Sequence, residues 1–399
     1  MKKALVVVLS AALLAVVAVH VLTCVRSPAN RCDFRLRMNE LACVRQRINP
    51  YDVWSGKVSL PPYYPNTLVG EPPAGCTKQV NAYAPWEYVA MLPFSLVSED
   101  CAWTIYCLLM GVAFAAVLFL PGRLSAEDSF LQAIVPMLVV AHPVWSNTGV
   151  GNFGIIVLAA SVAMAWAFNR GHDVLAGVFW AIAMLKPQIG LAFAIPLLMK
   201  RKIPSCLIAG GLCLALSVVA AVICRSSLVA MLFQGPEANT SFFYGCGTWP
   251  YFLCSDITRS RDILAGLLVG VVLCSTMTGL VRKEKDWFVL LMPAAITSCC
   301  WTYTQAYSHA MGWFVAFVLV SELLRTPRSK FLWILAALSA LSLSRGLLAS
   351  HGLCGFAGWT FPLSEHAFRC LDSLNSMLSL LLAFALCVHL TRRTPSVMK

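Results

Sequence analysis

Runs of about 20 apolar residues recur along this chain, and each is long enough to cross the ~30 Å hydrocarbon core of a bilayer as a helix. Apolar residues make up 59% of the 399-residue sequence and charged residues only 12%, whereas soluble proteins carry roughly 25% charged residues. A chain with so few charges cannot cover itself with a surface that water solvates. The sequence therefore predicts an all-α polytopic membrane protein.

About twelve segments have the length and composition of transmembrane helices. The fifth and sixth are short and flank Lys186-Pro187, so they form either one broken element or a re-entrant pair. The first follows Lys2-Lys3, as the core of a signal peptide would, but it exceeds the 7–15 residues of such a core, and we expect it to remain as a span. The segments are 4–24, 102–121, 129–145, 150–168, 173–186, 188–199, 203–224, 262–281, 287–304, 308–324, 331–349 and 373–391.

The basic residues of the short loops predict the orientation of this bundle. Every short loop on one side carries Lys or Arg, as in Lys200-Arg201-Lys202 and Arg282-Lys283. Loops of this kind face the cytoplasm in membrane proteins. With an even number of spans, both chain termini lie on the cytoplasmic side, and we expect the protein in the plasma (inner) membrane.

The long segment 25–101 is expected on the other, extracytoplasmic side, although it holds six arginines between Arg26 and Arg47. Long loops cross a membrane regardless of their charge. Residues from about 33 to 47 have the spacing of a short helix lying on the membrane, which Pro50 ends. We therefore expect one integral-membrane domain, 1–399, in which 25–101 forms an outer cap with interfacial helices.

Asp33 is a carboxylate within an arginine-rich stretch of this cap, and at helical spacing it shares a face with Arg37 and Glu40. An ionisable group at a membrane is costly and usually serves function, and a positioned carboxylate can take a proton from a hydroxyl group. Asp33 is therefore a candidate general base. Arg35 and Arg37 either belong to a solvated face that contacts anionic head groups or bind a phosphate, which guanidinium does bidentately.

Lys186 ends the apolar run from Val174 to Leu185 and precedes Pro187. A lysine at this place either snorkels from a helix end or faces a polar cavity. In a cavity, its point charge suits a phosphate group. We favour the phosphate-binding role because the predicted topology places Lys186 near the outer face.

Weaker candidates for substrate binding lie in the outer segments. The aromatic side chains among them either stack on a sugar ring or belong to an interfacial aromatic belt, and the histidines either contact substrate or form structural hydrogen bonds. These candidates are Tyr83, Trp86, His142, Asn152, Gln305 and His309.

Cysteines in the outer segments can form disulfides, because an extracytoplasmic compartment is oxidising. Cys246 with Cys254 and Cys354 with Cys370 are plausible pairs, while pairing among the first four outer cysteines stays open. The sequence contains no Cys/His spacing typical of zinc sites, no P-loop and no GxGxxG after a strand. We expect no cofactor, with a divalent metal left open.

Two blocks of short motifs resemble integral-membrane glycosyltransferases of the C-fold superfamily, and in particular glycosyltransferase family 87, the polyprenyl-phosphate-mannose-dependent mannosyltransferases. The motifs keep the family's order over about the first half of the chain, while the second half matches only in hydropathy. The first block is Asp33-Phe34, Asn49-Pro50-Tyr51-Asp52, Tyr83-Ala84-Pro85-Trp86 and Leu92-Pro93-Phe94; the second is Gly151-Asn152, Ala176-Gly177, Ala183-Met184-Leu185-Lys186-Pro187 and Leu197-Leu198-Met199-Lys200-Arg201.

This resemblance implies a C-type glycosyltransferase fold and a role for three residues. Asp33 would deprotonate the acceptor hydroxyl, Lys186 would contact the donor phosphate, and Asn152 would line the site. The implied donor is a polyprenyl-phosphate sugar carrying mannose or another hexose. The implied acceptor is a glycolipid or a glycan such as a polysaccharide, met on the extracytoplasmic face of the lipid bilayer, and no nucleic acid partner is expected.

Two other classes stay open. A polysaccharide polymerase or ligase also has about twelve spans and basic outer loops, but its main outer loop is expected late in the chain. A secondary transporter would show internal repeats with broken helices at matching positions, and the sequence shows no second copy of the break at Lys186-Pro187.

Overall fold

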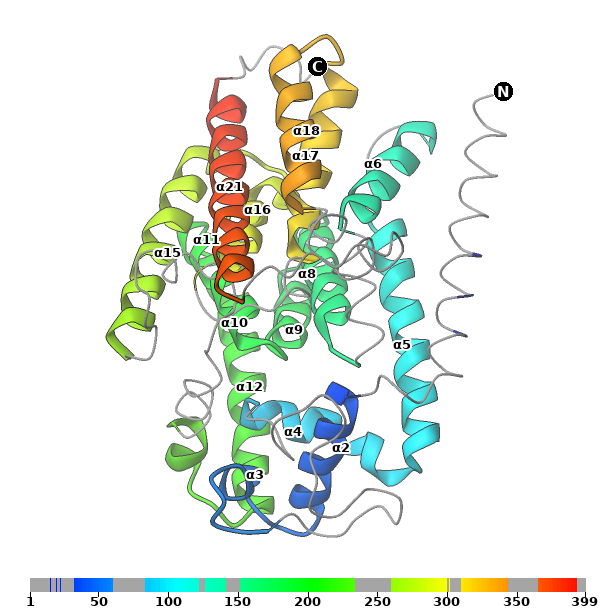
Figure 1. Ribbon diagram of the computed structural model, residues 1–399, viewed down its shortest axis with the longest axis vertical. Coiled ribbons are helices and arrows are strands. Elements are labelled where there is room, and N and C mark those ends of the chain that lie inside the picture. Colours follow the sequence, from blue (N-terminus) through cyan, green and yellow to red (C-terminus); the bar gives the residue numbers. More distant parts are fainter. Residues whose placement is uncertain are drawn as a thin grey trace.

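The computed structural model describes residues 32–59, 83–121, 126–140, 151–233, 260–299, 310–343 and 365–392, together with positions 15, 19, 22 and 301. Within these residues the chain is helical and contains no strand (Figure 1). The N-terminal elements are α2 (Cys32–Arg45), α3 (Pro50–Trp54), α4 (Pro85–Met91) and η2 (Leu92–Leu96). The elements that follow are α5 (Glu99–Phe119), α6 (Ala126–Val139), α8 (Gly154–Asn169), α9 (Asp173–Ala183), α10 (Pro187–Gly190), η3 (Leu191–Phe193), α11 (Ala194–Met199), α12 (Ile203–Ile223), α15 (Ser260–Val281), α16 (Trp287–Ser298), α17 (Trp313–Arg325), α18 (Lys330–Leu343) and α21 (Glu365–Thr391).

The helical character predicted from the apolar runs is confirmed. Each predicted span from 102–121 onward coincides with a helix, or with the short helices α10, η3 and α11 in the case of 188–199. Among the described residues, α5 and α12 are long and apolar enough to cross a membrane, and several shorter apolar helices accompany them. These features support a membrane protein, whereas twelve spans and the C-type fold stay predictions. The first predicted span, 4–24, lies almost wholly outside the described residues.

The helices divide into buried and exposed ones. Every residue of α16 is buried, and its Phe288 packs against Trp313 and Phe317 of α17 with ring centroids 6.2 and 4.9 Å apart. In contrast, α12 exposes large apolar side chains such as Leu207 and Val222. A helix that is apolar all round lies in a core or in a membrane. Helix α16 therefore forms the centre of the bundle, and the exposed face of α12 suits contact with lipid.

The predicted fifth and sixth spans form a broken element. Helix α9 ends at Ala183, and Lys186 adopts an extended conformation because Pro187 disfavours a helical residue before it. Two indole N–H groups stabilise the short helix that follows: Trp180 donates to the Gly190 carbonyl at 2.8 Å and Trp301 to the Gln188 carbonyl at 2.7 Å. Broken backbone at membrane depth is tolerated where protein buries it and satisfies its polar groups.

The N-terminal elements α2, α3 and α4 form a cap, and they pack against the C-terminal end of α12 (Figure 1). Val44 and Tyr88 of this cap share an apolar cluster with Ala220 and Ala221. At the opposite end of α12, Lys202 binds the Asp173 carboxylate at 2.7 Å. Since a 21-residue helix is about 31 Å long, the cap and the basic turn before α12 lie far apart, as the predicted topology requires. The membrane face that each one meets stays a prediction.

The described residues include only some of the cysteines of the outer segments. Cys43 is a buried free thiol and Cys101 an exposed one. The bridges expected between Cys246 and Cys254 and between Cys354 and Cys370 lie outside the described residues.

Replacing Gly177 should separate α9 from α12. A Cβ atom at Gly177 would lie 2.9 Å from the Ser205 carbonyl oxygen and 3.0 Å from Ile208 Cβ. The backbone oxygen has no flexible end that can move aside, so we expect Gly177→Ala to lower stability by about 1–3 kcal/mol. Thermal unfolding of the purified protein in detergent measures this.

Gly210→Ala is the matched control, because a Cβ at Gly210 in α12 meets nothing within 4 Å. Removing a helical glycine in open space should leave the melting temperature unchanged or raise it slightly. If both variants melt at the wild-type temperature, the close packing of α9 on α12 is wrong.

Candidate active site

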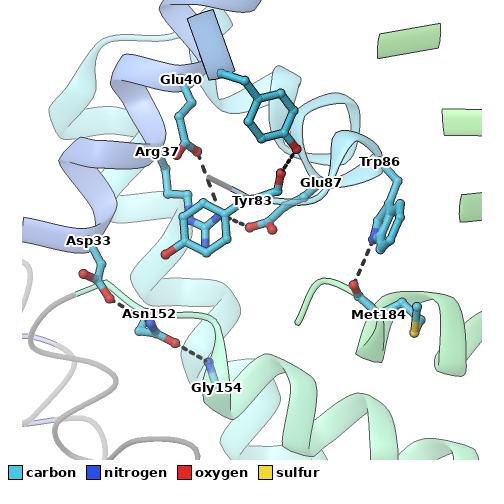
Figure 2. Close-up of polar contacts among 10 residues, drawn as sticks. Asp33, Arg37, Glu40, Tyr83, Trp86, Glu87, Asn152, Gly154 and Met184 are labelled. Atoms are coloured by element: carbon cyan, nitrogen blue, oxygen red, sulfur yellow. Dashed lines mark hydrogen bonds and ion pairs between the residues drawn. The ribbon is translucent and has the colours of Figure 1, made fainter. Parts of the chain in front are cut away.

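Asp33 and Asn152 meet where the first turn of α2 approaches the start of α8. The Asn152 Nδ2 donates a hydrogen bond of 2.7 Å to Asp33 Oδ2 (Figure 2). The Asn152 Oδ1 accepts from the Gly154 N–H at 3.1 Å, and the Asn152 carbonyl accepts from the Tyr106 hydroxyl at 2.7 Å. Because the Asn152 side-chain oxygen accepts from the backbone N–H of Gly154, the Asn152 amide nitrogen is directed at the Asp33 carboxylate. Local turn chemistry thus positions Asn152 to hold Asp33.

Gly151 allows α2 to come this close. Its φ is +80°, and a Cβ there would lie 2.5 Å from Phe34 Cβ and 3.0 Å from the Phe34 nitrogen. Glycine adopts such a conformation without steric cost and leaves room for the neighbouring backbone. The ring of Phe34 then packs edge-on against Trp103 at 5.1 Å, and Trp103 stacks on Tyr106 at 5.3 Å. These aromatic contacts fix the first turn of α2 and therefore the position of Asp33.

Arg37 lies one helical turn beyond Asp33 and is 2% exposed. Its guanidinium forms an ion pair with Glu87 of α4 and lies 3.9 Å from Glu40. The same group covers the ring of Tyr83, as Figure 2 shows. The arginine-rich stretch is therefore not a single solvated face, since Arg37 joins two elements of the cap by a buried ion pair.

The other arginines of α2 lie at the surface of the cap. Arg35 pairs with Glu99, at 3.0 Å, at the start of α5. Arg45 donates to the Ser95 carbonyl of η2. These contacts join α2 to the start of α5 and to η2, the short helix that precedes it.

Lys186 is 1% exposed at the break between α9 and α10. It lies within electrostatic range of Asp33, Arg37 and Glu87. The cap is attached at this place, because the Trp86 indole N–H donates to the Met184 carbonyl at 2.8 Å (Figure 2). The broken helix and the cap thus bring one lysine close to the carboxylate of Asp33.

The structure therefore gathers part of the predicted set in one place. Asp33, Asn152 and Lys186 come together, while Arg35 points to Glu99. Arg37, Tyr83 and Trp86 border the same region through the contacts described above. The remaining candidates, His142, Gln305 and His309, lie outside the described residues.

Glu87 was not among the residues that the sequence singled out. It follows Trp86 in the short cap helix α4 and is 1% exposed. Burial raises the pKa of the Glu87 carboxyl from 4.5 to about 7, although the charges of Arg37 and Lys186 oppose this shift. A lone acidic residue in an apolar stretch was the only sequence signal, and it could not show that Glu87 meets Arg37.

Metal binding is not indicated by the part of the chain that the structure describes. No three His, Cys, Asp or Glu side chains come together there in a way that could hold an ion. The cluster contains Asp33, Glu40 and Glu87, and the two glutamates are in contact with or close to Arg37.

Fold and site together define a helical membrane protein in which an N-terminal cap closes over a buried cluster of charges. The model of glycosyltransferase family 87 matches residues 81–251. The resemblance to this family is thus confirmed over that range, and the family indicates a glycosyltransferase. The match includes Tyr83, Trp86, Asn152 and Lys186 but begins after Asp33. No curated protein and no solved structure matches the chain significantly.

Glu87 should make the stability of the protein depend on pH. The unfolded carboxyl titrates near 4.5 and the folded one near 7, so the folded state binds the proton more tightly. The resulting stabilisation is present below pH 4.5 and is lost as the pH rises through about 7. It amounts to about 3 kcal/mol at most. In Glu87→Gln, which stays neutral, the melting temperature should change less between pH 5 and pH 8 than in the wild type.

Glu99→Gln is the control for this measurement. It removes a carboxylate at the start of α5 that is only partly buried and pairs with Arg35, and it should keep the wild-type pH dependence. A Glu87→Gln protein whose melting temperature follows pH as the wild type does would show that this carboxyl is ionised throughout the range.

Proposed function

We propose that this protein transfers a sugar, mannose or another hexose, from a polyprenyl-phosphate donor to a lipid-linked or polysaccharide acceptor. The hydrogen bond between Asn152 and Asp33 carries this proposal. It connects a carboxylate outside the family match to a residue inside it, and at the same place Lys186 supplies a positive charge. A base and a phosphate-binding cation are the two groups that such a transfer needs.

In the proposed reaction, Asp33 is the general base. The acceptor hydroxyl attacks the anomeric carbon of the donor sugar, the bond from that carbon to the phosphate oxygen breaks, and the hydroxyl proton passes to the carboxylate. Asn152 engages one carboxylate oxygen, Oδ2. The contacts of Asn152 with Gly154 and Tyr106 hold its side chain in place, and this side chain in turn keeps the Asp33 carboxylate in a fixed orientation. The carboxylate therefore needs little reorientation during the reaction.

Lys186 acts on the leaving group, the lipid phosphate of the donor. The departing lipid phosphate gains negative charge as the glycosidic bond breaks, and a cation held in a site that excludes water stabilises this charge strongly. Lys186 is held at a helix break whose polar groups are satisfied by Trp86, Trp180 and Trp301.

Under this proposal the cap serves as the roof of the reaction site. The Arg37–Glu87 pair joins α2 to α4, and the Trp86–Met184 hydrogen bond joins α4 to the helix break. A polyprenyl tail would remain in the lipid while its head group enters beneath the cap. We place this site on the extracytoplasmic face, following the distribution of basic loops in the sequence.

Asp33→Asn should abolish sugar transfer without unfolding the protein. The asparagine oxygen can still accept from Asn152, so the contact that orients α2 is kept, but an amide cannot take the proton. Losing a general base lowers a rate by about 10²- to 10⁴-fold. Transfer from a radiolabelled polyprenyl-phosphate hexose to a glycolipid acceptor, together with the melting temperature, measures both effects.

Asp52→Asn is the matched control. Asp52 is a partly exposed carboxylate of the same cap, 3.6 Å from Lys57, and its loss should leave transfer intact. If Asp33→Asn turns over at the wild-type rate, Asp33 is not the base. Loss of transfer in Asp52→Asn alone would move that role to Asp52.

Lys186→Ala should weaken the use of the donor more than binding of the acceptor. A hydrogen bond to a charged group contributes roughly 1.5–3 kcal/mol, so kcat/KM for the donor should fall by about 10- to 100-fold with little change in the acceptor KM. Lys57→Ala, which removes an exposed lysine of the cap, should change neither. Unchanged donor kinetics in a Lys186→Ala protein would mean that Lys186 has only a structural role.

A further inference from the structure

A second charged feature lies at the far end of α2, where the cap meets the C-terminal end of α12. A cavity of about 410 Å³ opens there, and Arg45, Arg47 and Arg225 line it. Among the described residues, the other side chains that line it are apolar and none is acidic. Arg45 follows Asp33 by twelve residues, which corresponds to about 18 Å along a helix. The cavity is therefore separate from the candidate active site.

Two of these arginines occupy backbone positions that favour glycine. Arg47 has a φ of 61° and Arg225 a φ of 50°. Each stands two residues after a helix whose end is closed by a backbone hydrogen bond to the carbonyl five residues earlier, from Ile48 to Cys43 at 2.9 Å and from Ser226 to Ala221 at 3.0 Å. This left-handed helix ending is most often formed by glycine. Two helices thus end in the same strained way, with a long cationic side chain at the point where each chain turns.

A side-chain contact holds the two turns together. The buried Asn49 donates from Nδ2 to the Ser226 hydroxyl at 3.3 Å, while its Oδ1 accepts from the Tyr51 N–H at 3.1 Å. Asn49 follows Arg47 by two residues, and Ser226 follows Arg225 directly. The positions of Arg47 and Arg225 relative to each other are therefore fixed by the fold before any ligand binds.

The helix dipole accounts for a cation at the end of each helix, but it does not account for three arginines in the lining of one cavity. Like charges brought together repel one another and destabilise the fold. An anion in the cavity would relieve this repulsion. Phosphate suits the geometry, because guanidinium binds it through paired hydrogen bonds.

An apolar stripe on α12 leads to the same cavity. Leu207, Leu214, Val218 and Val222 are exposed by 70%, 53%, 43% and 72%. Their spacing of seven, four and four residues places them on one face of the helix. Val222, the last of them, also lines the cavity. A soluble anion would make no use of this stripe, whereas a molecule with a phosphate head and long hydrocarbon chains would occupy both features.

We propose that this cavity binds the phosphate head group of an anionic glycerophospholipid from the bilayer, with its acyl chains along the stripe of α12. The lipid would join the end of α2 to the end of α12 and so hold the cap on the bundle. This role is separate from sugar transfer and does not depend on the proposed function.

The test uses the full-length protein, delipidated in a neutral detergent. Short-chain phosphatidylglycerol and phosphatidylcholine with the same acyl chains are titrated separately, and bound lipid is counted by native mass spectrometry alongside the melting temperature. We expect one phosphatidylglycerol molecule to bind about 10-fold or more tightly than phosphatidylcholine. The double variant Arg47→Gln/Arg225→Gln should lose this preference, with affinity for phosphatidylglycerol reduced by about 10- to 100-fold.

Two comparisons separate this site from simpler explanations. Arg328→Gln removes an exposed arginine elsewhere on the molecule and should bind phosphatidylglycerol as the wild type does; an equal loss in Arg328→Gln would show that only total charge matters and would overturn the proposal. Inorganic phosphate at the same concentrations should not stabilise the protein. If it stabilises as well as phosphatidylglycerol does, the cavity binds a soluble anion and the proposal is wrong.

The single variant Arg225→Gln keeps the test decisive if the double variant fails to fold. It retains the positive-φ residue Arg47 and the Asn49–Ser226 contact. In the absence of lipid it should fold with a melting temperature equal to or above that of the wild type, because one of the like charges at the cavity is removed, and it should still bind phosphatidylglycerol more weakly. Wild-type lipid affinity in a folded Arg225→Gln protein overturns the proposal.

Discussion

The buried ion pair between Arg37 and Glu87 is the interaction on which the candidate site depends. Taking both charges out of water is expensive, and removing one partner of such a pair typically costs about 3–5 kcal/mol because the other charge stays buried. The pair nevertheless joins the two cap helices α2 and α4 to each other. With α4 held, Trp86 reaches the carbonyl at the helix break; with α2 held, Asp33 reaches Asn152.

Two kinds of irregular backbone give this cap its contacts. At Gly151 a positive φ lets α2 approach the start of α8, and at Lys186 the following proline interrupts a helix. Both sites are expensive to bury, because they leave backbone polar groups without helical partners. The protein satisfies those groups with side chains, in particular the indole N–H groups of three tryptophans. The candidate site therefore lies where the regular helix is interrupted.

The sequence indicated which polar residues lie near Asp33 better than it indicated the partners of the arginines. Asn152 and Lys186 were identified by type and motif, and the structure brings both near Asp33. Arg37, in contrast, looked like part of a basic surface, because a sequence does not show which carboxylate will fold onto a given guanidinium. Glu87 was overlooked for the same reason. Its partner lies 50 residues away along the chain, beyond any local pattern.

The sequence by itself determined the helical membrane character, the positions of the helices and the break at Lys186-Pro187. These follow from local chemistry, namely apolar runs of membrane length and the restriction that proline places on the residue before it. Only the tertiary structure decided which charges meet. It buried Arg37 against Glu87, directed Arg35 to Glu99, and assembled Arg45, Arg47 and Arg225 around one cavity. The partner of a charged side chain depends on how distant segments pack against each other, and no short stretch of the sequence determines that packing.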